Sequence, residues 1–264
     1  MFLRKIRWSD LWVSSHDKSS DFYLCAWQRG SSPWPLACVR AALAAAGAAV
    51  LAWSLAGGGG AGPRWLIYLT NWGLLLVEAA ALAGLLVSCR ALCRRPPEES
   101  TTAWMALYWL LFNVAQTVAL AITVLYWLLL YDPETTVYPT AEALGRDVAT
   151  HALNSVLTLA ELLAARTPAR VLHAWQPLLL ATGYVAFSAV YYAAGGTNMF
   201  GESFIYPMLD WSAPAAAGGV AGAALAGALV LHLLVCALAR ARSAAAAVLL
   251  RPGTSGRDRG TRLP

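Results

Sequence analysis

The sequence predicts an all-α integral membrane protein, a polytopic bundle of six transmembrane helices. Of its 264 residues, 59% are hydrophobic and only 12% are charged, whereas soluble globular domains carry about 25% charged residues. The mean hydropathy of +0.55 points the same way. Six stretches have, or nearly have, the roughly 20 apolar residues that a bilayer-spanning helix needs. We expect helices because backbone polar groups in lipid have to be paired within the segment.

The expected spans follow one another with short connections and form one transmembrane domain, residues 36–238. A Trp-rich cytoplasmic amino segment, residues 1–35, precedes it, and a basic cytoplasmic tail, residues 239–264, follows it and is expected to be disordered. The fourth span is short and polar, and we include it because apolar spans flank it closely. The six spans are residues 36–56, 65–87, 104–131, 148–164, 171–194 and 213–238.

Lysine and arginine are distributed unequally between the two sides of these spans. Sixteen fall on the side that holds both termini, and only Arg64 and Arg146 fall on the other, while Arg40 lies inside the first span. Because cytoplasmic loops carry the excess of basic residues, both termini are expected in the cytoplasm. This asymmetry accounts for the net charge of +5, which therefore indicates no nucleic-acid partner. The localisation is multi-pass, in the plasma membrane or the endoplasmic reticulum.

Matched polar side chains mark the second and fourth expected spans. A glutamate in such a segment costs about 2.5–3.5 kcal/mol on insertion scales, so it usually faces the bundle interior. At 1.5 Å per residue, Thr70 and His151 lie within about 10 Å of the outer ends of their spans, and Glu78 and Glu161 share a deeper level. The sequence therefore predicts a polar pocket that opens outward. The residues are Thr70, Asn71 and Glu78 in one span, and His151, Asn154, Thr158 and Glu161 in the other.

Two interpretations of this pocket remain open. A hydroxyl nucleophile needs a base within hydrogen-bond reach, and imidazole is the usual one, so Thr70 and His151 are candidate catalytic residues with Asn71 or Asn154 as an oxyanion donor. Alternatively, the polar side chains only join helices, at about 0.6 kcal/mol each. Glu161 would then pair with Arg166.

Several further functions have weaker support in the sequence. No Gly-x-Ser-x-Gly, His-Glu-x-x-His, P-loop or Cys-x-x-Cys pattern occurs, so no metal, haem or nucleotide cofactor is indicated. Ion or proton transport through Glu78 and Glu161 lacks the inverted repeat that transporters carry. Gly218 and Gly222 form a small-xxx-small pair, which serves packing within the bundle or a homodimer through the last helix.

The longest outer loop, residues 195–211, is rich in aromatic residues and contains no Lys or Arg. Such a surface is unfavourable in water, so we expect the loop to fold back as a lid over the pocket between the second and fourth spans. Asp210 would then orient the imidazole or cap the last helix. The alternative is an interfacial segment that only anchors the bundle.

Three motifs carry a family resemblance. They are Tyr-Leu-Thr-Asn-Trp at residues 68–72, His-Ala-Leu-Asn-Ser at 151–155, and Gly-Gly-Thr-Asn-Met-Phe-Gly-Glu-Ser-Phe-Ile-Tyr-Pro-Met-Leu-Asp-Trp at 195–211. Together they resemble the rolling stone family, animal multipass membrane proteins named for a member linked to myoblast fusion. The resemblance runs from the amino segment to about Trp211. It implies a multipass protein of cell adhesion or fusion that works through loop 195–211.

A more distant likeness bears on mechanism. The family looks similar to the androgen-induced transmembrane proteins, which hydrolyse fatty-acid esters of hydroxy fatty acids with an intramembrane threonine and histidine. The matching positions are Thr70 and His151, while the rest of the sequence is poorly matched. This likeness implies a hydrolase of lipid esters, with membrane lipids as partners and a lipid ester as substrate.

Overall fold

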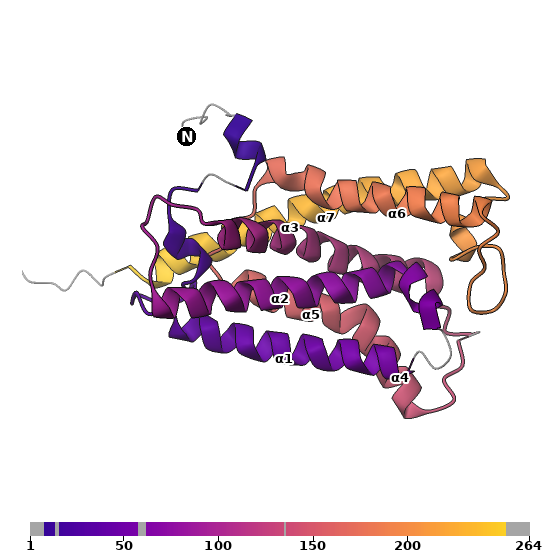
Figure 1. Ribbon diagram of the computed structural model, residues 1–264, viewed down its shortest axis with the longest axis horizontal. Helices are drawn as coiled ribbons and strands as arrows, with labels where there is room; N and C mark the ends of the chain where they lie inside the picture. The colour runs from indigo at the N-terminus through magenta and orange to yellow at the C-terminus, as the bar shows by residue number, and fades with distance from the viewer. Residues whose placement is uncertain (1–7, 14–15, 58–61, 135, 252–264) are drawn as a thin grey trace, which may run out of the picture.

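Long helices lie side by side along one axis of the computed structural model, which describes residues 8–13, 16–57, 62–134 and 136–251 (Figure 1). Within these residues the fold is all-helical, as predicted, and the single β-bridge pairs Cys25 with Ala165. The helices are α1 (Trp34–Gly57), α2 (Leu69–Cys93), α3 (Ala103–Leu125), α4 (Ala141–Val148), α5 (Asn154–Ala164), α6 (Trp175–Ala193) and α7 (Pro214–Leu249).

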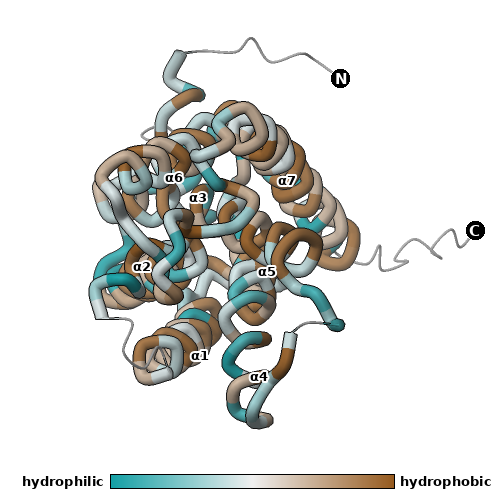
Figure 2. The backbone as a smooth tube through the Cα atoms, turned by 90° about the vertical axis from the view of Figure 1, so that its right-hand side faces the viewer, coloured by the Kyte–Doolittle hydropathy of each residue, from teal (hydrophilic) through white to brown (hydrophobic). Residues whose placement is uncertain are grey.

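The helix α3 is at the centre of the bundle. Seen end-on, it lies among α2, α5, α6 and α7, with α1 packed on the outer side of α2 and α5 (Figure 2). Its apolar residues are buried along most of its length, and its start is capped by the hydroxyl of Thr102, which accepts from the backbone N–H of Met105 at 3.3 Å. Such a cap satisfies one of the orphan donors of a helix terminus.

Four of the described helices are long and apolar enough to cross a membrane: α1, α2, Ala103–Leu130 and α7. The expected fourth span differs from its prediction, because α4, a π turn at Ala149–Leu153 and α5 follow one another without a break from residue 141. Part of the expected outer loop is therefore helical. The hydroxyl of Thr140 caps the start of α4 by accepting from the backbone N–H of Ala143 at 3.1 Å.

The described part of the amino segment packs across one end of the bundle. The backbone N–H of Ala26 donates to the carbonyl of Ala164 at 2.7 Å, and the indole of Trp27 donates to Leu163 at 2.8 Å. Arg166 donates to backbone carbonyls of this segment, at Cys25 and Gln28. The expected pairing of Arg166 with Glu161 was wrong, because these carbonyls take its donors.

Glu161 pairs instead with Arg40, which is 1% exposed. The guanidinium donates to Oε1 of Glu161 at 2.9 and 2.8 Å, and the same oxygen accepts from the hydroxyl of Tyr108 at 2.6 Å. The remaining donors of Arg40 reach the carbonyls of Phe22 and Gly84 and the hydroxyl of Ser88, each at 2.8 Å. One side chain thus joins α1, α2, α5 and the amino segment.

The helix α7 continues past residue 238, where the tail was expected to begin, and ends at Leu249. The reason is Arg242, which is buried and donates to the carbonyls of Leu162, Ala165 and Thr167. Residues 252–264 of the expected tail lie outside the described residues. A Cβ added at Gly218 or Gly222 would meet nothing within 4 Å, so neither glycine is needed for packing between the described helices.

We expect Arg40→Ala to lower the stability of the protein by about 3–5 kcal/mol, since removing one partner leaves the buried Glu161 carboxylate without its counter-ion. Thermal unfolding of the purified protein in detergent measures the effect. The control is Arg240→Ala, at an exposed arginine on α7. Equal unfolding temperatures for the two variants would contradict the role given to Arg40.

Candidate functional site

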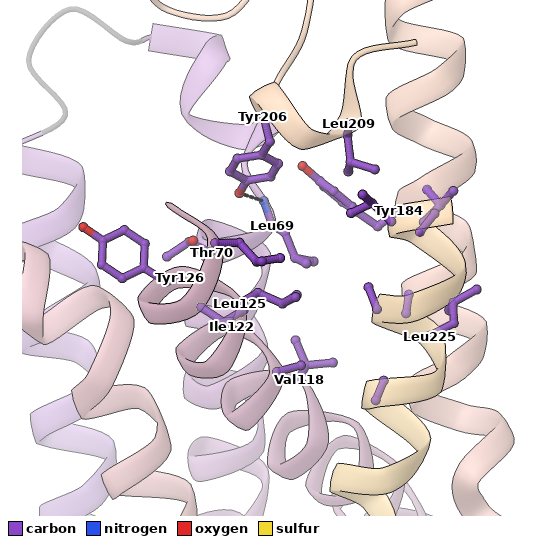
Figure 3. A pocket seen from close by; sticks show the side chains of 18 of the residues that line it. Leu69, Thr70, Val118, Ile122, Leu125, Tyr126, Tyr184, Tyr206, Leu209 and Leu225 are labelled. Atoms are coloured by element: carbon purple, nitrogen blue, oxygen red, sulfur yellow. Dashed lines mark hydrogen bonds between the residues drawn. The ribbon is translucent and has the colours of Figure 1, made fainter. Parts of the chain in front are cut away.

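An apolar cavity of about 110 Å³ lies between α2, α3, α6 and α7, toward the end of the bundle opposite the amino segment (Figure 3). Its walls are mostly aliphatic, including Val118, Ile122 and Leu225. Among the lining residues, polar groups come from Thr70, Thr117, Tyr126, Tyr184 and Tyr206. Ligand sites of this kind combine apolar walls with a few polar groups that orient the ligand.

The loop between α6 and α7 folds over this cavity. The hydroxyl of Tyr206 accepts from the backbone N–H of Leu69 at 3.0 Å, which satisfies an orphan donor in the first turn of α2 (Figure 3). Met208 and Leu209 of the loop also line the cavity. The loop thus folds back as expected, but it covers a cavity between α2, α3, α6 and α7 instead of one between the second and fourth spans.

Thr70 occupies the first turn of α2, beneath the loop. Burial raises the pKa of Tyr206, and the neighbouring Thr70 side chain opposes part of that increase, since it favours the phenolate. Thr70 and Tyr206 both line the cavity at the end that the loop covers (Figure 3). This position gives a hydroxyl group access to an apolar space that is covered from above.

His151 lies in the π turn at Ala149–Leu153, and Asp147 holds its ring. The imidazole Nδ1 is 3.1 Å from Oδ1 of Asp147 and 2.9 Å from the Asp147 carbonyl oxygen. Among the described residues, no group forms a hydrogen bond with Nε2. A carboxylate on Nδ1 fixes the tautomer and leaves Nε2 as the basic nitrogen, which is the arrangement of catalytic triads.

The same carboxylate organises two tyrosines. Oδ2 of Asp147 accepts from the hydroxyls of Tyr126 and Tyr138, each at 2.5 Å. The ring of Tyr126 stacks flat on His151, with centroids 3.5 Å apart and planes 7° from parallel. Because Tyr126 also lines the cavity, it connects the imidazole to the space where Thr70 lies.

Thr70 and His151 lie in neighbouring segments of the bundle, since α2 contacts both α5 and the π turn before it. A Cβ on Gly73 would lie 3.9 Å from Nδ2 of Asn154, so α2 and α5 adjoin there. Thr70 precedes Gly73 by three residues, His151 precedes Asn154 by three, and both segments run the same way along the bundle (Figure 1). No hydrogen bond joins Thr70 to His151 within the described part of the chain.

The other predicted site residues have separate surroundings. Asn71 donates to the carbonyl of Trp65 at 2.5 Å, and Asn154 donates to that of Thr150 at 3.2 Å, so both amides bind backbone. Glu78 is buried against Gly47, and its Oε2 has no hydrogen-bond partner among the described groups.

Glu161 belongs to the Arg40 network at the other end of the bundle. Asp210 accepts from the backbone N–H of Ser212 at 2.9 Å, in the turn that leads into α7. The carboxylate at the imidazole is thus that of Asp147 and not that of Asp210. Across the described residues, no three His, Cys, Asp or Glu side chains gather closely enough to hold a metal ion.

A family model described as protein rolling stone matches residues 60–243. The chain belongs to the rolling stone family. Protein rolling stone of Drosophila melanogaster is 31% identical over a 163-residue alignment that covers 57% of this chain and 58% of that protein. The chain therefore matches less than two thirds of this relative's length. No solved structure matches the chain.

All the predicted site residues lie inside the region that the rolling stone family model covers. Sequence reasoning missed Asp147, Tyr126 and Tyr206. A signal for Asp147 was present, since residues four apart lie on one face of a helix and His151 is four residues further on. No sequence signal pointed to Tyr126 or Tyr206, because their partners, Asp147 and the backbone N–H of Leu69, belong to other helices.

We expect Tyr206→Phe to destabilise the loop by about 1 kcal/mol, since the backbone N–H of Leu69 loses its acceptor. Protease cleavage of loop 195–211 in the detergent-solubilised protein should become faster. Tyr192→Phe is the control, because the hydroxyl of Tyr192 has no hydrogen-bond partner among the described residues. Cleavage rates that match between the two variants would exclude the loop anchor.

Proposed function

We propose that this membrane protein of the rolling stone family is an intramembrane hydrolase of lipid esters. The observation that carries the proposal is the Asp147–His151 pair, in which the carboxylate contacts Nδ1 at 3.1 Å and Nε2 has no partner within the described residues. Thr70 lines an apolar cavity, and Tyr126, which also lines it, stacks on the imidazole. Hydroxyl, imidazole and carboxylate are the three groups of a catalytic triad in nucleophilic ester hydrolysis.

In the proposed reaction, Nε2 of His151 takes the hydroxyl proton of Thr70 while the threonine oxygen attacks the ester carbonyl carbon. The tetrahedral intermediate expels the alcohol, which receives the proton from His151, and leaves an acyl group on Thr70. Water, deprotonated by the same nitrogen, then releases the fatty acid and restores Thr70.

Tyr206 is the proposed oxyanion donor. Its oxygen accepts from the backbone N–H of Leu69, so its hydrogen is left to donate to the negative oxygen of the intermediate. Asn71 and Asn154, the donors expected from sequence, already donate to backbone carbonyls. The acyl chain would occupy the aliphatic part of the cavity.

Catalysis requires Thr70 and His151 to approach one another after the lipid binds. Catalytic hydrogen bonds are often long or absent in empty sites and tighten with substrate. The two π turns, Tyr126–Leu130 and Ala149–Leu153, offer the backbone adjustment. Turns of this kind are frequent at functional sites.

A hydrolase-directed fluorophosphonate probe should label the purified protein at Thr70, and Thr70→Ala should abolish the labelling. His151→Gln and Asp147→Asn should reduce its rate by about 100-fold or more, since each removes general-base assistance. Thr102→Ala, which changes a hydroxyl at the opposite end of the bundle, should keep full labelling. Labelling that persists in Thr70→Ala would reject the mechanism.

The second candidate is a non-enzymatic membrane protein of cell adhesion or fusion. Its support is the exposure of Met199 and Phe200, at 48% and 78%, on loop 195–211. Exposed apolar side chains of this kind are typical of contact surfaces. Cell-contact activity that is lost in Phe200→Ser and kept in Thr70→Ala would favour this function over hydrolysis.

We also propose that the chain has six spans with both termini in the cytoplasm. The support is that α6 and the segment formed by α4 and α5 run alongside the four long apolar helices (Figure 1), together with the sixteen-to-two distribution of basic residues. In a variant whose five native cysteines are replaced, a membrane-impermeant maleimide should label Thr197→Cys from outside intact cells. In the same background, labelling of Gly30→Cys should require permeabilised cells. The reverse result would overturn the topology.

A further inference from the structure

An open groove of about 1010 Å³ lies between the end of α2 and the start of α3. Its rim carries three exposed arginines, Arg90, Arg94 and Arg95. Val87, Pro96 and Pro97 form its apolar wall, and Trp104 lies at its edge. The groove is at the end of the bundle opposite the cavity that contains Thr70 (Figure 1).

The charged side chains that line the groove are all arginines, since Glu98 and Glu99 of the same loop are not among its lining residues. None of its three arginines forms an ion pair with a carboxylate of the described residues, and the guanidinium of Arg90 lies over the ring of Trp104, 5.3 Å from its centroid. The first turn of α3 faces the same space through Ala103 and Trp104, and it adds the positive end of a helix dipole. Phosphate oxygens suit such a site, because arginine binds them through charge-assisted hydrogen bonds.

The position of the groove favours a phosphate that belongs to a lipid headgroup. Arg90 belongs to the last turn of α2, a helix apolar enough to cross a membrane, so the groove lies where that helix leaves the hydrocarbon. Leu86 and Leu82, one and two turns earlier on α2, are 38% and 51% exposed. A lipid with its headgroup among the arginines could therefore lay an acyl chain along these leucines.

We propose that this groove binds the headgroup of an anionic phospholipid, with its phosphate between Arg90, Arg94 and Arg95. The proposal rests on the chain being a membrane protein and is independent of the hydrolase. Basic clusters immediately beside a transmembrane helix attract anionic lipids, and each arginine near the surface contributes about a fivefold increase in binding. Trp104, beneath Arg90, holds one guanidinium in place at headgroup depth.

The test uses the purified protein in a neutral detergent, with lipid binding measured by native mass spectrometry. Phosphatidylserine should bind at least tenfold more tightly than phosphatidylcholine of the same chain length. Replacing Arg90, Arg94 and Arg95 together by Gln should remove that preference. The matched control replaces Arg29, Arg240 and Arg251, three exposed arginines outside the groove, by Gln and should retain it.

Other outcomes would overturn the proposal. They are equal binding of the two lipids, and an equal loss of preference in the control variant. If soluble glycerophosphoserine displaced the lipid at the lipid's own concentration, the groove would be a site for free phosphate esters. Thermal unfolding accompanies each measurement, and all six arginines are exposed, so both triple variants should unfold at the temperature of the unmodified protein.

Discussion

The buried guanidinium of Arg40 is the constraint on which the arrangement of these helices depends. Arginine stays charged at all ordinary pH values, so inside an apolar bundle it has to be surrounded by acceptors. Glu161 supplies the counter-charge, and Phe22, Gly84 and Ser88 supply the other oxygens. Because these acceptors come from α2, α5 and the amino segment, the position of α1 is fixed against all three.

The two ends of the protein differ in how their polar groups are bonded. At one end, Arg40, Arg166 and Arg242 donate to backbone carbonyls and close the bundle with the amino segment. At the other end, the loop after α6 covers an apolar cavity. The end with many ion and hydrogen-bond partners provides rigidity, and the end with the cavity and the two π turns retains space for a ligand.

The polar groups at the cavity end are connected through one carboxylate. Asp147 binds His151, Tyr126 and Tyr138 at once, so the imidazole is oriented by the start of its own helix and stacked by a ring from the end of α3. His151 does not itself line the cavity, but Tyr126, the ring stacked on it, does. The imidazole is therefore held by its own helical segment through Asp147 and by tertiary structure through Tyr126.

Much of this protein follows from its sequence alone. Apolar length and the low share of charged residues determine a helical membrane bundle, since lipid leaves the backbone no other partners. The motifs around Thr70, His151 and residues 195–211 determine the family, which the match over residues 60–243 confirms. Counting residues also predicts a matched level for Thr70 and His151, because helix rise is constant.

Tertiary structure alone decided which side chains meet. Sequence spacing favoured Arg166 as the partner of Glu161, whereas Arg40 reaches it from 121 positions away. It suggested Asp210 for the imidazole, whereas Asp147 binds it. Periodicity tells which face of a helix is polar but not which helix that face contacts. Those contacts depend on packing and on where buried donors find acceptors, so Tyr126, Tyr206 and the Arg40 network emerge only when the helices are assembled.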